Sequence, residues 1–136
     1  MKPVYILYYR ECPNEERLPE IQVPAEKSVR QVSEINKIDI SLKLIPSKVQ
    51  YLKKIAADPN YDFIFIHLGG IPEMGYELAQ ETRRFSENAI FVAESTMHPR
   101  GEKEVLQYFD EYTWGISNTF DLEAILKKYG YIPAEK

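Results

Sequence analysis

The chain has 136 residues, 44% hydrophobic and 28% charged, which predicts one globular domain over residues 1–136, with a C-terminal tail (residues 131–136) that frays. Its net charge of −4 excludes non-specific nucleic-acid binding, which requires clustered Lys and Arg. The single cysteine cannot form an intrachain disulfide, and no apolar run has transmembrane length. We therefore expect a cytoplasmic protein without membrane insertion.

The first predicted helix begins well after the first predicted strand. Residues 4–9 are apolar and β-prone, which predicts a strand. Three prolines in the next segment argue against one continuous helix over residues 10–24. A helix is therefore expected only after Pro24. The residues expected on its inner face are Val29, Val32 and Ile35.

A second strand and helix follow in the pattern. Apolar and polar residues alternate over residues 38–45, which predicts a strand. Ser47 is the expected N-terminal cap of a helix that residues 58–60 end. The residues expected on the inner stripe of this helix are Val49, Leu52, Ile55 and Ala56.

Residues 62–68 predict the most buried strand of the chain. Residues 63–66 are all apolar and leave the strand no polar face, which is typical of the middle of a parallel sheet. The strand opens at His67 onto a loop, and a helix is expected from Pro72. The residues expected to point inward from this helix are Met74, Leu78, Thr82 and Phe85.

The last third of the chain predicts two more strands and two more helices. The strands are expected over residues 89–93 and 113–117, and a helix between them from about residue 101 to residue 112. The face expected to be buried on this helix contains Val105, Phe109 and Tyr112. Strands that alternate with helices imply a parallel sheet with right-handed crossovers.

The final helix has candidate signals at both ends. Thr119 or Asp121 is the expected N-terminal cap, and Gly130 suits the C-terminal cap. The residues expected to point inward are Leu122, Ile125, Leu126 and Tyr129.

Two motifs resemble the CheY-like receiver domains of response regulators. Residues 72–78, Pro-Glu-Met-Gly-Tyr-Glu-Leu, are similar to the turn and helix start of that family, and residues 118–123, Asn-Thr-Phe-Asp-Leu-Glu, look like its Lys-Pro-Phe-Asp stretch. The resemblance covers about residues 1–12 and 38–130. It implies a flavodoxin-like α/β three-layer sandwich with a five-stranded parallel sheet of order 2-1-3-4-5 and helices on both faces.

The positions that carry chemistry in that family hold other residues here. By this resemblance, the acidic pair of the family maps to Arg10 and Glu11, and the acceptor aspartate maps to His67. The hydroxyl residue maps to Ala93 and the lysine to Asn118. A shift of one residue would give Tyr9 and Arg10 for the pair and Val92 for the hydroxyl. Phosphoryl transfer to a carboxylate needs Mg²⁺ with oxygen ligands, for which an imidazole beside an arginine is a poor substitute. We therefore predict no metal, no cofactor, no catalytic residue and no phosphorylation at position 67.

The resemblance implies a stand-alone pseudo-receiver, a signalling module that binds a protein partner without aspartyl phosphorylation. In receivers the fourth helix, fifth strand and fifth helix form the usual docking surface, which would also be the contact in a homodimer. The aromatic residues expected on this interaction face are Tyr108, Tyr112 and Trp114.

Two other interpretations remain open. The chain would also suit a small-molecule or anion-binding protein or an enzyme of the same fold, with its site at the carboxyl ends of the first, third and fourth strands. The residues that would form such a site are Arg10, His67, Gly69, Gly70, Ser95 and Asn118. No carboxylate partner for His67 is evident in the sequence, so a structural role is favoured for this residue. A subunit of a larger assembly is the third interpretation.

Overall fold

Five parallel strands form the central sheet in the computed structural model, which describes residues 3–69, 71–95 and 102–133. The strands are β1 (Val4–Tyr9), β2 (Ile40–Ile45), β3 (Phe63–His67), β4 (Ile90–Glu94) and β5 (Glu111–Thr113). Their order in the sheet is β2-β1-β3-β4-β5, and all four pairings are parallel. The predicted flavodoxin-like fold class is confirmed.

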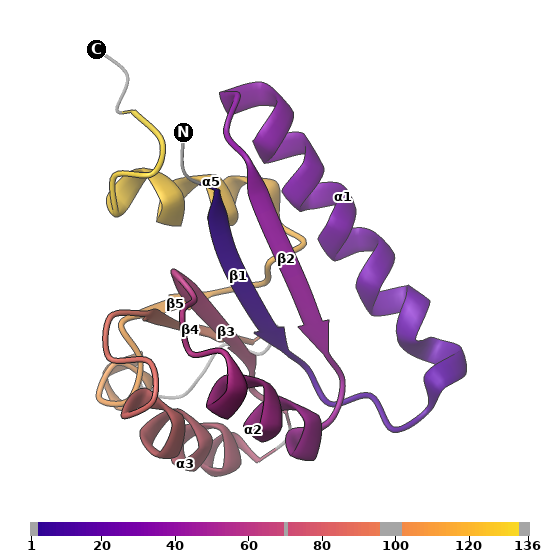
Figure 1. Ribbon diagram of the computed structural model, residues 1–136, viewed down its shortest axis with the longest axis vertical. Coiled ribbons are helices and arrows are strands. Elements are labelled where there is room, and N and C mark those ends of the chain that lie inside the picture. The colour runs from indigo at the N-terminus through magenta and orange to yellow at the C-terminus, as the bar shows by residue number, and fades with distance from the viewer. Residues whose placement is uncertain (1–2, 70, 96–101, 134–136) are drawn as a thin grey trace.

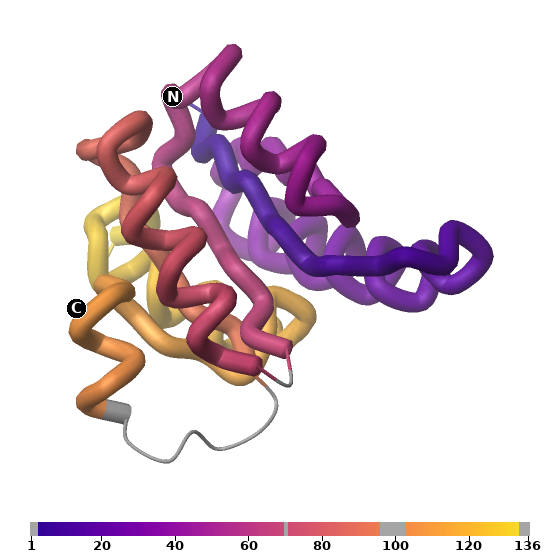
Figure 2. The backbone as a smooth tube through the Cα atoms, turned by 90° about the horizontal axis from the view of Figure 1, so that it is seen from below, coloured from indigo at the N-terminus to yellow at the C-terminus, as the bar shows by residue number. Residues whose placement is uncertain are grey.

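Helices cover both faces of this sheet (Figures 1 and 2). The helices are η1 (Glu15–Arg17, a 3-10 turn), α1 (Leu18–Asn36), α2 (Lys48–Ala57), α3 (Pro72–Arg83), α4 (Glu102–Val105) and α5 (Thr119–Lys128). Side chains of α1 and α5 pack in one core, and side chains of α2, α3 and α4 pack in the other. Within the described ranges, no helix combines the length and the apolar character needed to cross a bilayer.

The central strand β3 contributes to both cores. Phe63 and Phe65 pack on the side of α1 and α5, whereas Ile64 and Ile66 pack on the side of α2 and α3. All four side chains are fully buried, because successive residues of a strand point to opposite faces and both faces are covered. The predicted two-sided burial of this segment is confirmed.

The first helix begins earlier than the sequence predicts. It starts at Leu18, directly after η1, and not after Pro24. Pro19 lies in the first turn, where an N–H group has no helical partner to lose. Pro24 does remove a helical hydrogen bond, but it lies on an exposed face where water can solvate the freed carbonyl. Pro19 therefore suits the first turn of α1, and Pro24 does not mark its start.

Several residues predicted to point inward from helices are exposed instead. Ser47 caps α2 as predicted, by accepting a hydrogen bond from the Gln50 N–H group. The buried residues of α2 and α3 include Tyr51 and Thr82, whose hydroxyl groups are hydrogen-bonded at 3.1 Å across the helix–helix contact. Both hydroxyl groups therefore lie on the buried faces of their helices. The residues that are exposed against prediction are Ile35, Val49, Ala56, Met74 and Phe85.

The predicted fourth helix is mostly not a helix. The structure describes one α-helical turn, α4, and then a turn that leads into β5. Val105 and Phe109 are buried as predicted, but Tyr112 is half-buried on β5. β5 therefore lies at Glu111–Thr113, two residues before the predicted start of the strand.

Asn118 caps α5 in place of either predicted residue. Its side-chain oxygen accepts a hydrogen bond of 3.2 Å from the Asp121 N–H group, so the helix proper starts at Thr119. The predicted inner residues Leu122, Ile125 and Leu126 are buried, while Tyr129 is half-buried.

The chain after α5 is held against the protein. Gly130 has a φ of 82°, the left-handed conformation of a helix C-terminal cap, as predicted. Ile132 is buried in the core that contains α1 and α5. The prediction of a frayed tail is therefore wrong for residues 131–133, and residues 134–136 lie outside the described residues.

Candidate functional site

A buried carboxylate, Glu94, lies at the carboxyl end of β4. Its side chain is only 3% exposed. The register of the sheet pairs Glu94 with His67, so both residues end their strands at the same edge. The sequence pattern predicts that the strand stops at Ala93 and does not place Glu94 in the site, whereas β4 extends to Glu94.

Four groups surround the Glu94 carboxylate. Oε1 accepts a hydrogen bond from the Tyr8 hydroxyl group and lies 2.9 Å from His67 Nδ1 and 3.8 Å from Arg10 Nη1. Oε2 accepts a hydrogen bond of 2.7 Å from the Ile116 N–H group. Removing a carboxylate from water carries a large penalty, which these partners offset. Glu94 thus joins groups from β1, β3 and the segment after β5.

Tyr8 remains a proton donor to this carboxylate. Burial first, and the negative charge of Glu94 second, raise the pKa of Tyr8 far above its ordinary value of 10.0. The Tyr8 hydroxyl oxygen also accepts a long contact of 3.4 Å from Arg10 Nη1. Tyr8 and Arg10 are therefore both held by Glu94 and by each other.

His67 has the carboxylate partner that its sequence context does not reveal. An ionised carboxylate only accepts hydrogen bonds, so opposite an ionised Glu94 the His67 Nδ1 atom carries the proton. The imidazole is thereby fixed in one orientation, while part of the ring lines a cavity. An imidazole oriented by a carboxylate is also the arrangement found in general bases.

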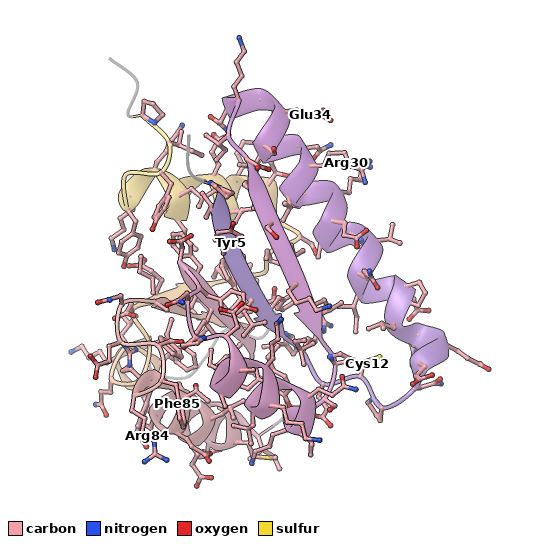
Figure 3. The ribbon with its side chains drawn as sticks, viewed as in Figure 1. Tyr5, Cys12, Arg30, Glu34, Arg84 and Phe85 are labelled. Atoms are coloured by element: carbon pink, nitrogen blue, oxygen red, sulfur yellow. The ribbon has the colours of Figure 1, made fainter. Side chains whose placement is uncertain are left out.

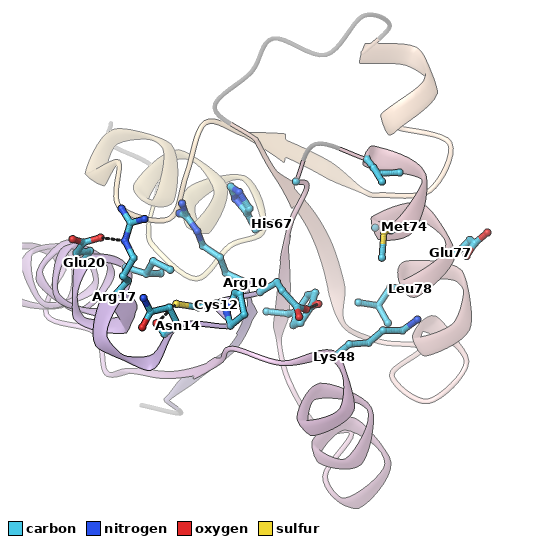
Figure 4. A pocket seen from close by; sticks show the side chains of 17 residues that line it. Arg10, Cys12, Asn14, Arg17, Glu20, Lys48, His67, Met74, Glu77 and Leu78 are labelled. Carbon is cyan, nitrogen blue, oxygen red and sulfur yellow. Dashed lines mark hydrogen bonds and ion pairs between the residues drawn. The ribbon is translucent and has the colours of Figure 1, made fainter.

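A cavity of about 830 Å³ opens beside this cluster (Figure 4). One wall is the segment of residues 10–17 together with the first turns of α1, and the opposite wall is α3. The early start of α1 builds the first wall, because Arg17, Glu20 and Ile21 line the cavity. The volume lies within the range of about 300–1,000 Å³ that is usual for ligand pockets.

The cavity lining contains charged and apolar side chains. Its cationic side chains are Arg10, Arg17 and Lys48, and its acidic ones are Glu11, Glu20 and Glu77. Its larger aliphatic side chains are Ile21, Ile71, Met74 and Leu78. Within the described residues, no group of three or more His, Cys, Asp and Glu side chains is arranged to hold a metal ion.

The structure brings four of the predicted site residues together. Arg10, Glu11, His67 and Gly69 all line the cavity. Arg10 and His67 are linked through Glu94, whereas the Glu11 carboxylate accepts a hydrogen bond from the Tyr9 hydroxyl group. The predicted loop residue Gly70 lies outside the described residues.

Three predicted site residues do not line the cavity. Ala93 is fully buried in the core beneath α2 and α3, since its side chain points to the face opposite Glu94. Asn118 is exposed and its side chain caps α5. Ser95 is buried beside β5, where its N–H group donates to the Thr113 carbonyl at 3.1 Å.

The aromatic residues of the predicted interaction face differ in their surroundings. Tyr108 stacks on Tyr76 with ring centroids 4.7 Å apart, so one face of the Tyr108 ring is covered within the protein. Tyr112 is half-buried, and its hydroxyl group donates to the Ser95 carbonyl at 3.2 Å. Trp114, which follows β5, is 49% exposed. Of the three rings, Trp114 offers the most surface to another molecule.

Comparison with known proteins identifies a shared fold. No protein-family model and no curated protein sequence matches the chain. A CheY-like response regulator receiver domain protein from Methanospirillum hungatei has a TM-score of 0.62 and 14% identity, with 94% of each chain covered. A response regulator from Thermotoga maritima, solved with Mg²⁺ and BeF, has a TM-score of 0.60 and 20% identity, with 94% of this chain and 98% of that one covered.

A third solved structure of similar fold is not named as a response regulator. It is a 3-dehydroquinate dehydratase-like protein from Bifidobacterium longum, with a TM-score of 0.59 and 11% identity, covering 99% of this chain and all of that one (100%). At these identities the similarities establish the CheY-like, flavodoxin-like fold and leave function to the residues of the site.

Proposed function

We propose that the protein is a pseudo-receiver, a signalling module that acts by contact with a protein partner and without aspartyl phosphorylation. The observation that carries this proposal is the pairing of His67 with Glu94. His67 ends β3, where the resemblance places the phosphoacceptor, and its Nδ1 atom lies 2.9 Å from a buried carboxylate.

The arrangement around Glu94 disfavours the chemistry of a receiver. Such chemistry requires Mg²⁺ with oxygen ligands beside a free acceptor carboxylate. The buried carboxylate here is held by Tyr8, His67 and the Ile116 N–H group, with Arg10 beside it. A metal ion entering this site would displace these donors and meet the positive charge of Arg10. We infer that the signal depends on what binds to the protein.

The surface around Trp114 is the proposed contact for the partner. A large, exposed aromatic ring is a common anchor in protein interfaces. A shallow depression of about 430 Å³ adjoins this ring and is lined by residues of β5 and α5. A homodimer would use the same surface.

Recovery of the partner from native cells tests the proposal. The purified protein serves as bait, and Trp114→Ala is compared with Phe85→Ala, since Phe85 is similarly exposed (46%) at the end of α3. We expect the same protein to be recovered with the wild type and with Phe85→Ala, and to be lost with Trp114→Ala. Equal recovery with both variants would place the contact elsewhere, and no specific recovery with the wild type would contradict the proposal.

The cavity supports a second candidate function. A ligand-binding protein or an enzyme of the same fold would use a pocket of this size at the carboxyl edge of the sheet. The carboxylate-oriented imidazole of His67 would suit such a role.

A further inference from the structure

We propose that the cavity beside His67 binds a small amphipathic organic anion, with its carboxylate or phosphate head at Arg10 and Arg17 and its apolar body against α3. This inference deepens the proposed function and rests on it, because the bound anion would be the input that replaces phosphorylation. The size of the cavity is the first support for this proposal. A cavity of about 830 Å³ is far larger than a lone inorganic ion requires and suits a whole organic molecule.

Arg10 is placed to receive the charged head. Its Nη1 atom lies 3.8 Å from Glu94 and 3.4 Å from the Tyr8 hydroxyl group, both longer than the usual N–H···O distance of about 2.7–3.2 Å. A guanidinium group has five N–H donors, so most of the hydrogen-bonding capacity of Arg10 is left for a ligand. Planar recognition of a carboxylate or phosphate by two parallel hydrogen bonds is the interaction that arginine favours.

Arg17 extends the cationic end of the cavity. It lies in η1, on the same wall as Arg10, and its Nε atom is 3.2 Å from the Glu20 carboxylate. Figure 4 shows the side chains of Arg10, Arg17 and His67 directed toward the same side of the cavity, whereas Lys48 extends toward α3. Two guanidinium groups and an imidazole therefore lie around the place proposed for the head.

Within the described residues, none of the three acidic side chains of the cavity forms an ion pair with Arg10. Glu11 accepts a hydrogen bond from Tyr9, and Glu20 is paired with Arg17. Glu77 lines the cavity from α3, on the side opposite Arg10 and Arg17 (Figure 4). An anionic head at Arg10 would thus approach a cation whose carboxylate partner, Glu94, lies 3.8 Å away.

The wall formed by α3 is apolar and exposed. Ile71 and Met74 line the cavity, yet they are 60% and 59% exposed, and Leu78 lies behind them. Removal of large apolar side chains from water stabilises a complex, and a flexible methionine side chain adapts to ligands of different shape. The apolar body of the anion would cover this wall.

Binding of defined probes tests the proposal. Octanoate and octyl phosphate carry both parts of the proposed ligand, octanol lacks the charge and acetate lacks the apolar body. Calorimetry and amide chemical-shift mapping should show saturable one-to-one binding of at least one amphipathic anion, with shifts at residues 67–78. Octanol and acetate should bind at least about tenfold more weakly.

Two variants in the cavity and two outside it sharpen the test. Arg17→Gln and Met74→Ser alter exposed side chains outside the Glu94 cluster, so both variants should fold. Each should lower the affinity for the anion by about three- to tenfold. The matched controls are Arg84→Gln and Phe85→Ser, which Figure 3 places at the end of α3, away from the cavity residue Cys12. Both controls should bind like the wild type.

Three results would overturn the proposal. They are the absence of saturable binding of either anion to the folded protein, equal affinity for octanol and octanoate, and unchanged affinity in Arg17→Gln. The test contains no partner protein and no phosphoryl donor. Its failure would therefore remove the proposed input and leave the partner recovery experiment to decide the proposed function.

Discussion

The carboxyl edge of β3 and β4 contains a buried, hydrogen-bonded carboxylate, whereas the adjacent surface around β5 contains a half-exposed aromatic ring. At the edge, Glu94 is buried and its donors come from three other parts of the chain. Around β5, Trp114 is half-exposed beside a shallow depression. The first region is fixed by mutual hydrogen bonds, whereas the second presents a half-exposed aromatic ring. His67, where the sequence resemblance places the phosphoacceptor, is thus held by a buried carboxylate.

The largest predicted effect is the loss of the Glu94 carboxylate. Glu94→Ala would leave Tyr8, His67 and the Ile116 N–H group without their acceptor and Arg10 without its nearest negative charge. We expect the free energy of unfolding, measured with urea, to fall by about 3–5 kcal/mol. Trp114→Ala, at a half-exposed ring, should lower it less, by about 1 kcal/mol. Similar effects of the two variants would contradict the difference drawn between the two regions.

Alkaline pH should destabilise the protein through its buried tyrosines. Burial raises the pKa values of Tyr8 and Tyr51 above 10.0, and for Tyr8 the charge of Glu94 adds to the shift. Below pH 10 the folded and unfolded states both hold these protons, so stability is unaffected. Above pH 10 the unfolded chain loses them first, and stability should fall by about 1.4 kcal/mol per pH unit for each tyrosine.

Phenylalanine variants separate this effect from general alkaline unfolding. Tyr8→Phe and Tyr51→Phe should each reduce the slope of stability against pH between pH 10 and about 12, as measured by urea unfolding. Tyr5→Phe, at a half-exposed ring on β1, is the matched control. An unchanged slope in Tyr8→Phe would show that its proton is not held by the folded protein.

Removing Pro24 should stabilise the wall that α1 contributes to the cavity. Pro24→Ala restores an N–H group in the helix interior on an exposed face, and we expect a gain of about 1–3 kcal/mol in thermal or urea unfolding. Pro19→Ala, in the first turn, should change stability much less. A loss of stability in Pro24→Ala would contradict a helix that is continuous through residue 24.

The smallest predicted effect concerns Asn118. As the N-terminal cap of α5, it should contribute about 1 kcal/mol, which Asn118→Ala would remove. Because Asn118 does not line the cavity, the variant should leave octanoate binding unchanged. A loss of binding without a loss of stability would indicate that Asn118 belongs to the binding site, as the sequence resemblance implies.

The fold is predictable from the sequence because its strongest signals are local. Four consecutive apolar residues, 63–66, predict a strand buried on both sides, and alternation with helical patterns predicts the parallel sheet. The start of α1 is not predictable in this way, because three prolines close together argue for an irregular segment. Tertiary packing of Ala25, Val29 and Val32 outweighs that local preference.

The centre of the site is not predictable, for a different reason. Glu94 follows an apolar run, and a charged residue at that point indicates the end of a strand. Its partners Tyr8, Arg10 and His67 are 27 to 86 residues away along the chain, so no spacing in the sequence connects them. The resemblance places His67 and Arg10 in one site but does not include Glu94, which lies beside both.

Treatment with acetyl phosphate and Mg²⁺ tests the central claim, that this edge of the sheet is held by an internal carboxylate–imidazole pair and accepts no phosphoryl group. The intact mass is measured without acid, so that a phosphohistidine would survive, and the Thermotoga maritima response regulator serves as the comparison protein. We predict that the mass of this protein stays unchanged. A stable increase by the mass of one phosphoryl group would contradict the account.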